Sequence, residues 1–272
     1  LIGPTAAQIY EHFPGLEKIV IIKKKRFNLH WFDMYLKSRQ KKWDVIIDLR
    51  SSILSYFINS KKKYVFKKNN KLHHLEQLRK SFNLITNKLR IYTSKLDEKI
   101  VCENINSKFK YIVIFPGGNW NPKIWSINNY NKLLKKIIDK FINIKFIIVG
   151  SENEREKYIS KIQENISKDY FIDLMGKSLT LTSAYMGKSK LFIGNDSGLM
   201  HLAVASKLKT IALFGPTNDK IYGHIKNNNL VIRTKESYEY FKSIKINSDL
   251  SYMESITPDE LFLTINEMNF ND

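Results

Sequence analysis

Short runs of branched apolar residues alternate along the chain with stretches whose apolar positions recur every three or four residues. In the second half, runs at 110–115, 144–149, 171–177, 190–194 and 209–214 predict strands. A parallel strand that is covered on both faces reads as such a continuous apolar run. The stretches between these runs predict helices, with Ser126 as the N-cap of one and Thr257 and Pro258 at the start of the last. This alternation predicts an α/β fold of doubly wound parallel sheets.

The first half follows the same alternation. Runs at 18–24, 43–52 and 62–68 predict strands, and we expect the second of them to be buried on both faces. Helical patterns at 28–42, 53–60 and 73–85 separate them, and the polar stretch 97–110 predicts a linker. We therefore divide the chain into domains of residues 1–106 and 107–256, followed by a C-terminal helix in residues 257–272.

Basic residues are concentrated in the first half of the 272-residue chain. Residues 1–110 contain 24 Lys and Arg against 9 Asp and Glu, whereas residues 111–272 contain 21 against 17. The clusters lie at 23–26, 37–42 and 61–71. This asymmetry indicates a surface that faces a polyanion, which is a nucleic acid, an anionic bilayer or a phosphorylated substrate. The alternative interpretation is that these lysines form ordinary solvated faces.

The remaining composition excludes several classes of protein. Cys102 is the one cysteine, so the chain has neither a disulfide framework nor a four-cysteine zinc site. This low cysteine content is typical of proteins in a reducing compartment. No apolar run approaches the roughly 18–20 residues of a membrane span. The phosphate-loop, G-x-G-x-x-G and H-E-x-x-H motifs do not occur in the sequence.

Polar and glycine residues follow the predicted strands of the second half at 116–119, 150–154, 195–198 and 215–217. Because ligands of doubly wound domains bind beyond the carboxyl ends of the strands, these turns predict one cleft. Asp196 or Ser197 is placed to cap a helix, and Gly198 lets an anion approach the free N–H groups at the helix start. His201 follows in the first turn, where a buried structural histidine is the alternative interpretation.

Two charged residues near these turns are candidates for the same site. Lys123 lies between a Gly-Gly loop and a helix start, flanked by Pro122 and Trp125, where its ammonium group is placed for an anion. Glu154 follows the turn at 150–151, where a carboxylate accepts hydrogen bonds from ribose hydroxyls. The alternative role of Glu154 is a first-turn acid that interacts favourably with the helix dipole.

Segment 190–217, KLFIGNDSGLMHLAVASKLKTIALFGPT, resembles the signature of glycosyltransferase family 9, the lipopolysaccharide heptosyltransferases. Segment 115–125, FPGGNWNPKIW, resembles the family's Pro-Gly…Lys-x-Trp block, and segment 41–50 its Asp-Leu-Arg block. The blocks follow the family order over nearly the whole chain. The resemblance implies a GT-B architecture, with two Rossmann-like domains that face a central cleft. The second domain would bind a nucleotide sugar and the first the acceptor, and the last helix would cross back to the first domain.

The resemblance also implies roles for individual residues. Lys123 is expected to contact the donor phosphates and stabilise the leaving group, Glu154 to bind the ribose and Met175 to contact the base. Backbone N–H groups of residues 197–199 are expected to bind the diphosphate, while the flanking aspartate and histidine order the site. The implied donor-binding set is Gly117, Gly118, Lys123, Glu154, Met175, Asp196, Ser197, Gly198, Leu199 and His201.

The implied activity is inverting transfer of heptose from ADP-heptose to a lipopolysaccharide-core-like or other membrane-anchored acceptor, with neither metal nor cofactor. The expected partners are the nucleotide sugar, an anionic glycolipid and the membrane surface, with no nucleic acid, and the expected location is the cytoplasmic face of the bacterial inner membrane. Another nucleotide sugar, or a non-catalytic polyanion-binding role, is the alternative. The family's general base is an aspartate in an N-terminal Gly-Asp turn; we expect that segment upstream of Leu1, since Asp48 falls inside an apolar strand.

Overall fold

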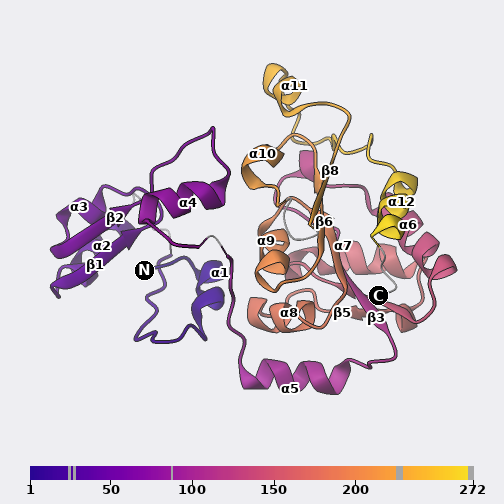
Figure 1. The fold of residues 1–272 in the computed structure, drawn as a ribbon, viewed down its shortest axis with the longest axis horizontal. Helices are drawn as coiled ribbons and strands as arrows, with labels where there is room; N and C mark the ends of the chain where they lie inside the picture. Colours follow the sequence, from indigo (N-terminus) through magenta and orange to yellow (C-terminus); the bar gives the residue numbers. More distant parts are fainter. Residues whose placement is uncertain (24–25, 27–28, 87, 225–228, 269–272) are drawn as a thin grey trace. The chain divides into compact units, whose positions relative to one another are not determined.

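The computed structural model describes the chain except for residues 24–25, 27–28, 87, 225–228 and 269–272 (Figure 1). Two compact units make up the chain, Leu1–Lys88 and Leu89–Asp272. The GT-B fold class that the sequence predicts agrees with this organisation, because each unit contains parallel strands connected through helices. The predicted basic cluster at 23–26 and the predicted helix in 257–272 lie partly outside the described residues.

The first unit contains a small parallel sheet. Trp43 of β1 lies opposite Ser60 of β2, and Asp48 lies opposite Val65. The strand predicted at 18–24 is present only as an isolated bridge between Ile21 and Ile2, and Lys24 lies outside the described residues. The elements of this unit are α1 (Pro4–Ala7), a 3-10 turn (Gln8–Tyr10), α2 (His30–Ser38), β1 (Trp43–Asp48), α3 (Leu54–Phe57), β2 (Ser60–Val65) and α4 (His74–Phe82).

One face of β1 is open to solvent, so the prediction that this strand is buried on both faces is wrong. Ile47 is 61% exposed, and Val45 on the same face is 46% exposed. Only β2 pairs with β1 among the described residues, and a two-stranded sheet has too little neighbouring structure to cover an apolar face.

The second unit is built on a six-stranded parallel sheet with the order β5-β4-β3-β6-β7-β8. Successive strands are connected by helices that cover both faces of the sheet, as Figure 1 shows. Such strands carry apolar residues on both faces, and β3, β4, β6 and β7 are accordingly almost completely buried. The strands are β3 (Lys110–Phe115), β4 (Ile144–Ile148), β5 (Phe171–Asp173), β6 (Leu191–Asn195), β7 (Thr210–Phe214) and β8 (Leu230–Arg233).

Two apolar clusters fill the space between this sheet and its helices. One contains residues of α6, α7 and α12, and the other contains residues of α5, α8 and α9. The caps predicted at Ser126 and Thr257 are confirmed, because their hydroxyl groups accept the N–H groups of Asn129 and Glu260. The helices are α5 (Lys95–Asn104), α6 (Ile127–Lys140), α7 (Glu152–Gln163), α8 (Leu179–Met186), α9 (Gly198–Ala205), α10 (Asp219–Tyr222), α11 (Tyr238–Ser243) and α12 (Pro258–Glu267), with 3-10 turns at Asn121–Lys123 and Lys168–Tyr170.

The segment that the sequence predicts as a linker is helix α5 instead. Ser94 caps it in a reciprocal capping box with Asp97, and Val101 is buried against the second unit's core, where α5 packs on α8. The compact units therefore divide after Lys88 rather than at residue 106. Helix α12 packs on α6 of its own unit, where Leu261 and Ile265 are buried.

The core of the second unit gives a direct test of this packing. Leu134 of α6 is fully buried, whereas Leu263 of α12 is 60% exposed. We expect Leu134→Ala to lower the free energy of unfolding by about 2–5 kcal/mol, because it loses buried apolar surface and leaves a cavity. Leu263→Ala is the matched control and should change it by less than about 0.5 kcal/mol. Urea unfolding followed by circular dichroism measures both, and equal effects would contradict the packing of α6.

Candidate active site

The chain reverses its direction across the sheet between β3 and β6. From β3 it continues to β4 and β5 on one side, and it then returns to β6, which pairs with β3 on the other side. The loops that follow these two strands therefore leave in opposite directions, and a crevice at such a reversal is the usual ligand site of an open α/β sheet. We call the carboxyl ends of β3 and β6, with residues 116–125 and 196–201, the switch-point site.

The side chain of Asn195, at the end of β6, connects the parts of this site. Its amide nitrogen donates to the carbonyl oxygens of Gly117, at 2.9 Å, and Pro116, at 3.3 Å. Its amide oxygen accepts from the Trp125 backbone N–H at 3.1 Å and the Tyr130 hydroxyl at 3.4 Å. Asn195 is fully buried, so these contacts satisfy a polar group that would otherwise be costly.

Helix α9 begins at this site with hydrogen-bond donors directed outward. Ser197 is the N-cap, and its hydroxyl accepts the Met200 N–H at 3.3 Å. Within the described part of the chain, the N–H groups of Gly198 and Leu199 have no acceptor. A Cβ atom at Gly198 would have no neighbour within 4 Å, so this helix start faces open space. Free N–H groups and the positive end of the helix dipole make it suited to an anion.

Lys123 and Asp196 form a largely buried ion pair beside this helix start. The Lys123 Nζ lies 3.9 Å from the Asp196 Oδ2, and their side chains are only 12% and 10% exposed. Burial raises the pKa of the Asp196 carboxyl, while Lys123 and the nearby Thr217 hydroxyl partly oppose the rise. That hydroxyl makes no hydrogen bond of ordinary geometry among the described residues.

A distant segment holds Lys123 in place. The Tyr252 N–H donates to the Pro122 carbonyl at 3.0 Å, and the Ser251 hydroxyl donates to the Ile124 carbonyl at 2.7 Å. The Trp125 indole donates to the Ile256 carbonyl at 2.8 Å. Residues 249–256 therefore form a strap across the turn that carries Lys123. Since proline at 122 and these bonds restrict the backbone, the lysine side chain projects from a fixed position.

Glu154 joins the turn after β4 to the loop after β3. Its Oε1 accepts the Gly118 N–H at 3.0 Å, while its Oε2 accepts the Ser151 hydroxyl at 2.6 Å in a capping box. A Cβ atom at Gly117 would lie 2.6 Å from Oε1, so a larger residue here would displace the Glu154 carboxylate. The first-turn role of Glu154 is thus present in the structure, and its contact with ribose stays a prediction.

Two other predicted residues lie in different surroundings. Met175 is buried, and its methyl group packs so closely on Gly150 that a Cβ atom there would lie 2.5 Å away. The contact of Met175 with a base stays a prediction. His201 Nδ1 lies 2.8 Å from Nε2 of His224, and the rings meet edge to face. This pair ties α9 to the end of α10, and a partner at residue 224 was not apparent from the sequence.

Arg233, at the end of β8, organises the loop after β7 and was also missed by the sequence analysis. Its guanidinium group donates to the carbonyl oxygens of Gly215 and Thr217 and pairs with Asp219. No local pattern in the sequence indicated this role, because Gly215 and Thr217 are distant from Arg233 along the chain. The loop that it holds brings Thr217 close to Asp196.

Nowhere in the described part of the chain do three or more histidine, cysteine, aspartate or glutamate side chains gather as a metal site would require. None of the described helices combines the length and the apolar character that a bilayer crossing requires.

The architecture and the switch-point site place this chain in the GT-B class of α/β proteins. Similar solved structures are a glycosyltransferase of family 9 from Veillonella parvula and the ADP-heptose lipopolysaccharide heptosyltransferase II of Escherichia coli. The TM-scores are 0.77 and 0.71 at 18% and 17% identity, covering 99% and 98% of this chain and 87% of each of those chains. An E. coli heptosyltransferase solved with ADP has a TM-score of 0.72 at 16% identity, over 98% of this chain and 88% of its own.

Sequence comparison identifies the family. The model of glycosyltransferase family 9 (heptosyltransferase) matches residues 75–250, so the chain belongs to this family, as its motifs predict. The lipooligosaccharide heptosyltransferase 2 of Campylobacter jejuni serotype O:2 is 28% identical over 228 residues, which are 78% of this chain and 69% of that protein. The lipopolysaccharide heptosyltransferase 2 of E. coli K12 is 24% identical over 186 residues, 66% of this chain and 53% of its own.

The raised pKa of Asp196 predicts a dependence of stability on pH. Between the unfolded and the native pKa the native state binds more protons, so the free energy of unfolding falls as the pH rises through this interval. Above the interval the ionised carboxylate lowers stability. We expect Asp196→Asn, which mimics the protonated acid, to exceed the wild type in stability at neutral pH, with the difference shrinking below about pH 4.

Urea unfolding across this pH range measures the difference. Glu156→Gln, on the exposed middle of α7, is the control and should show no such trend. If the Asp196→Asn variant were less stable than the wild type at neutral pH, that result would contradict the raised pKa.

Proposed function

We propose that this chain transfers heptose from ADP-heptose to a lipopolysaccharide-core-like, membrane-anchored acceptor at the cytoplasmic face of the inner membrane. The observation that carries the proposal is the pairing of Lys123 with Asp196 beside the outward-facing N–H groups at the start of α9. This arrangement is suited to a diphosphate. The donor and acceptor classes rest on membership of the family and on the names of its relatives.

In the proposed reaction an acceptor hydroxyl attacks the anomeric carbon of the donor. The new carbon–oxygen bond forms as the bond from that carbon to the β-phosphate oxygen breaks, with inversion, and the hydroxyl proton passes to a general base. Negative charge develops on the departing ADP. The Lys123 ammonium group and the N–H groups of Gly198 and Leu199 stabilise that charge electrostatically, because they are already in place before the bond breaks.

The remaining residues of the site position the donor. Glu154 is proposed to bind the ribose through the carboxylate that also accepts the Gly118 N–H. Met175 is proposed to contact the base, and Asp196 holds Lys123 toward the phosphates. His201 orders the first turn of α9 through its contact with His224.

A substitution at Gly198 tests anion binding with little effect on folding. The open space around it allows Gly198→Ala without a clash, and the N-terminal turn of a helix tolerates alanine, so stability should stay within about 1 kcal/mol. The added methyl group occupies the path of an anion to the N–H groups, so we expect at least a tenfold loss of ADP-heptose affinity by calorimetric titration.

Gly187→Ala is the matched control. It lies at the C-terminal end of α8, at the opposite edge of the sheet, and its Cβ would make only ordinary contacts at 3.5 Å. Affinity of this variant should equal that of the wild type. Undiminished affinity of the Gly198→Ala variant, or preference of the wild type for UDP- or GDP-sugars over ADP-heptose, would contradict the proposed donor site or the proposed donor.

Lys123 gives an independent test of the phosphate contact. Loss of a charge-assisted hydrogen bond costs about 1.5–3 kcal/mol, so Lys123→Ala should weaken ADP binding roughly 10–100-fold. Lys188→Ala, an exposed lysine beyond the end of α8, is the control and should bind ADP normally. If both variants bound ADP as the wild type does, Lys123 would not contact the phosphates.

A further inference from the structure

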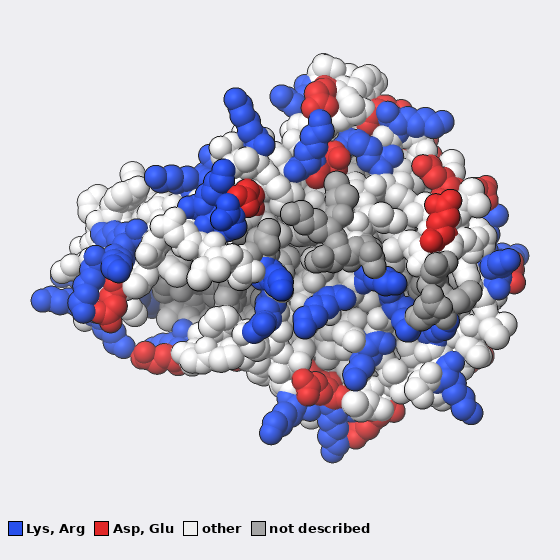
Figure 2. Space-filling model, in the orientation of Figure 1, with Lys and Arg blue, Asp and Glu red and all other residues white. Residues whose placement is uncertain are grey.

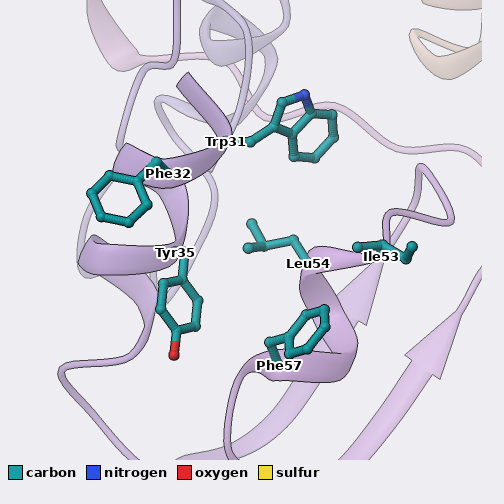
Figure 3. A pocket seen from close by; sticks show the side chains of 6 residues that line it. All are labelled: Trp31, Phe32, Tyr35, Ile53, Leu54 and Phe57. Atoms are coloured by element: carbon teal, nitrogen blue, oxygen red, sulfur yellow. The ribbon is translucent and has the colours of Figure 1, made fainter. Parts of the chain in front are cut away.

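The first unit carries an apolar pocket that the proposed donor site does not use. Figure 3 shows it between α2 and α3, with a volume of about 560 Å³. Leu54 points from α3 toward the rings of Trp31 and Tyr35 on α2. The lining residues are Trp31, Phe32, Tyr35, Ile53, Leu54 and Phe57.

The rim of this pocket is exposed to an extent that is unusual for aromatic side chains. Phe32 is 61% exposed, Phe57 is 68% exposed and Ile53 is 77% exposed. Tyr56, next to Phe57 on α3, and Leu29, just before α2, are also exposed, by 66% and 57%. Contiguous exposed apolar surface of this kind marks a contact with a protein or a membrane. A pocket for one small polar ligand would also present a few converging polar groups, whereas this one is lined almost entirely by apolar side chains.

Cations from α2 and from β2 border the apolar surface. The Arg39 guanidinium lies 5.5 Å from the centre of the Tyr35 ring, and Lys37 is exposed in the last turn of α2. On the other side, the Lys63 ammonium group donates to the Tyr56 carbonyl at 3.1 Å. Long basic side chains beside aromatic residues are the composition of a surface that lies in a membrane interface.

The acidic residues of this region offset only part of that charge, and one of them, Asp33, lies on α2 itself. Asp44 pairs with Lys61 at 2.7 Å, and Asp48 accepts the N–H groups of Arg50 and Ser52. Burial alone would raise the pKa of Asp48, but these hydrogen bonds outweigh it and lower the pKa. Over residues 1–88 the sequence has 19 Lys and Arg against 6 Asp and Glu. Blue side chains accordingly prevail over red ones where Figure 2 shows this unit.

We propose that the aromatic surface of α2 and α3, which comprises Trp31, Phe32, Tyr35, Ile53, Tyr56 and Phe57, inserts into the interfacial region of an anionic phospholipid bilayer. Arg39, Lys37 and Lys63 contact lipid phosphates at its edge. Charge complementarity selects a bilayer over a second copy of this chain, because two copies of so basic a surface repel each other. The biological role of this contact rests on the proposed function, because the contact would bring the protein to a membrane-anchored acceptor. Membrane binding itself requires neither donor nor acceptor.

Sedimentation with vesicles tests this surface. The full chain is mixed with vesicles of phosphatidylcholine and phosphatidylglycerol at 3:1, and with phosphatidylcholine alone. We expect binding to the anionic vesicles that weakens as salt is raised, with little binding to the neutral ones. Phe32→Ser with Phe57→Ser should lower the partition coefficient at least tenfold. Ile142→Ser with Leu263→Ser, which removes side chains that are 85% and 60% exposed in the second unit, should leave it unchanged.

A second pair of double variants tests the contribution of the cations to vesicle binding. Lys37→Gln with Arg39→Gln should lower the partition coefficient about 25-fold at low salt, on the basis of about 1 kcal/mol for each cation near the surface. Lys135→Gln with Lys188→Gln removes two exposed lysines from the second unit and should have a small effect. Trp31→Phe should also reduce the blue shift of tryptophan emission that accompanies binding.

The outcomes separate this proposal from its competitors. If the double variant Phe32→Ser with Phe57→Ser binds vesicles as the wild type does, the aromatic surface is not the membrane contact. If the wild type is a dimer and these substitutions make it a monomer without reducing vesicle binding, the surface is an interface between copies, and the proposal is wrong. ADP-heptose titration of the same variants should be unchanged, so a failure of vesicle binding is distinct from a failure of the donor site.

Discussion

The switch-point site depends on the carboxamide of Asn195. This one buried side chain donates to the carbonyl groups at the end of β3 and accepts the backbone N–H that precedes α6. It therefore sets the distance between two strand ends that would otherwise be joined only by the sheet. An aspartate at this position would lose both donors, and a leucine would leave a buried N–H group and two carbonyl groups to other partners. The loop after β3 and the start of α9 take their relative position from this connection, while residues 249–256 hold the turn that carries Lys123.

The switch-point site contains two charged groups that lower the stability of the fold and are proposed to act on the donor. Lys123 and Asp196 are both largely removed from water, and a pair separated by 3.9 Å recovers only part of the free energy of hydration that each ion loses. The raised pKa of Asp196 expresses the same imbalance. In contrast, the nearby Asn195 side chain is fully buried and hydrogen-bonded at both its nitrogen and its oxygen.

The sequence predicted those parts of the molecule that depend on local pattern. Strands β3 to β7, the caps at Ser126 and Thr257 and the helix start at Gly198 follow from apolar runs, hydroxyl residues and glycine in short segments, whereas β8 was not predicted. The burial of β1 could not be predicted, because an apolar strand has the same sequence whether or not other structure covers it. The roles of Asn195 and Arg233 were missed for a related reason. Their partners are loop carbonyl groups, whose identity depends on how distant segments meet and not on the residue types nearby.

The strap of residues 249–256 has a consequence for the order in which the protein matures. Lys123 is translated before residues 249–256, but the carbonyl groups on either side of it accept hydrogen bonds from Tyr252 and Ser251, and the Trp125 indole donates to the Ile256 carbonyl. Leu261 and Ile265 then close the apolar cluster beneath α6. A nascent chain therefore carries every residue of the switch-point site well before it can fix their geometry. The site therefore becomes competent only after residues 249–256 have been translated and have folded onto it.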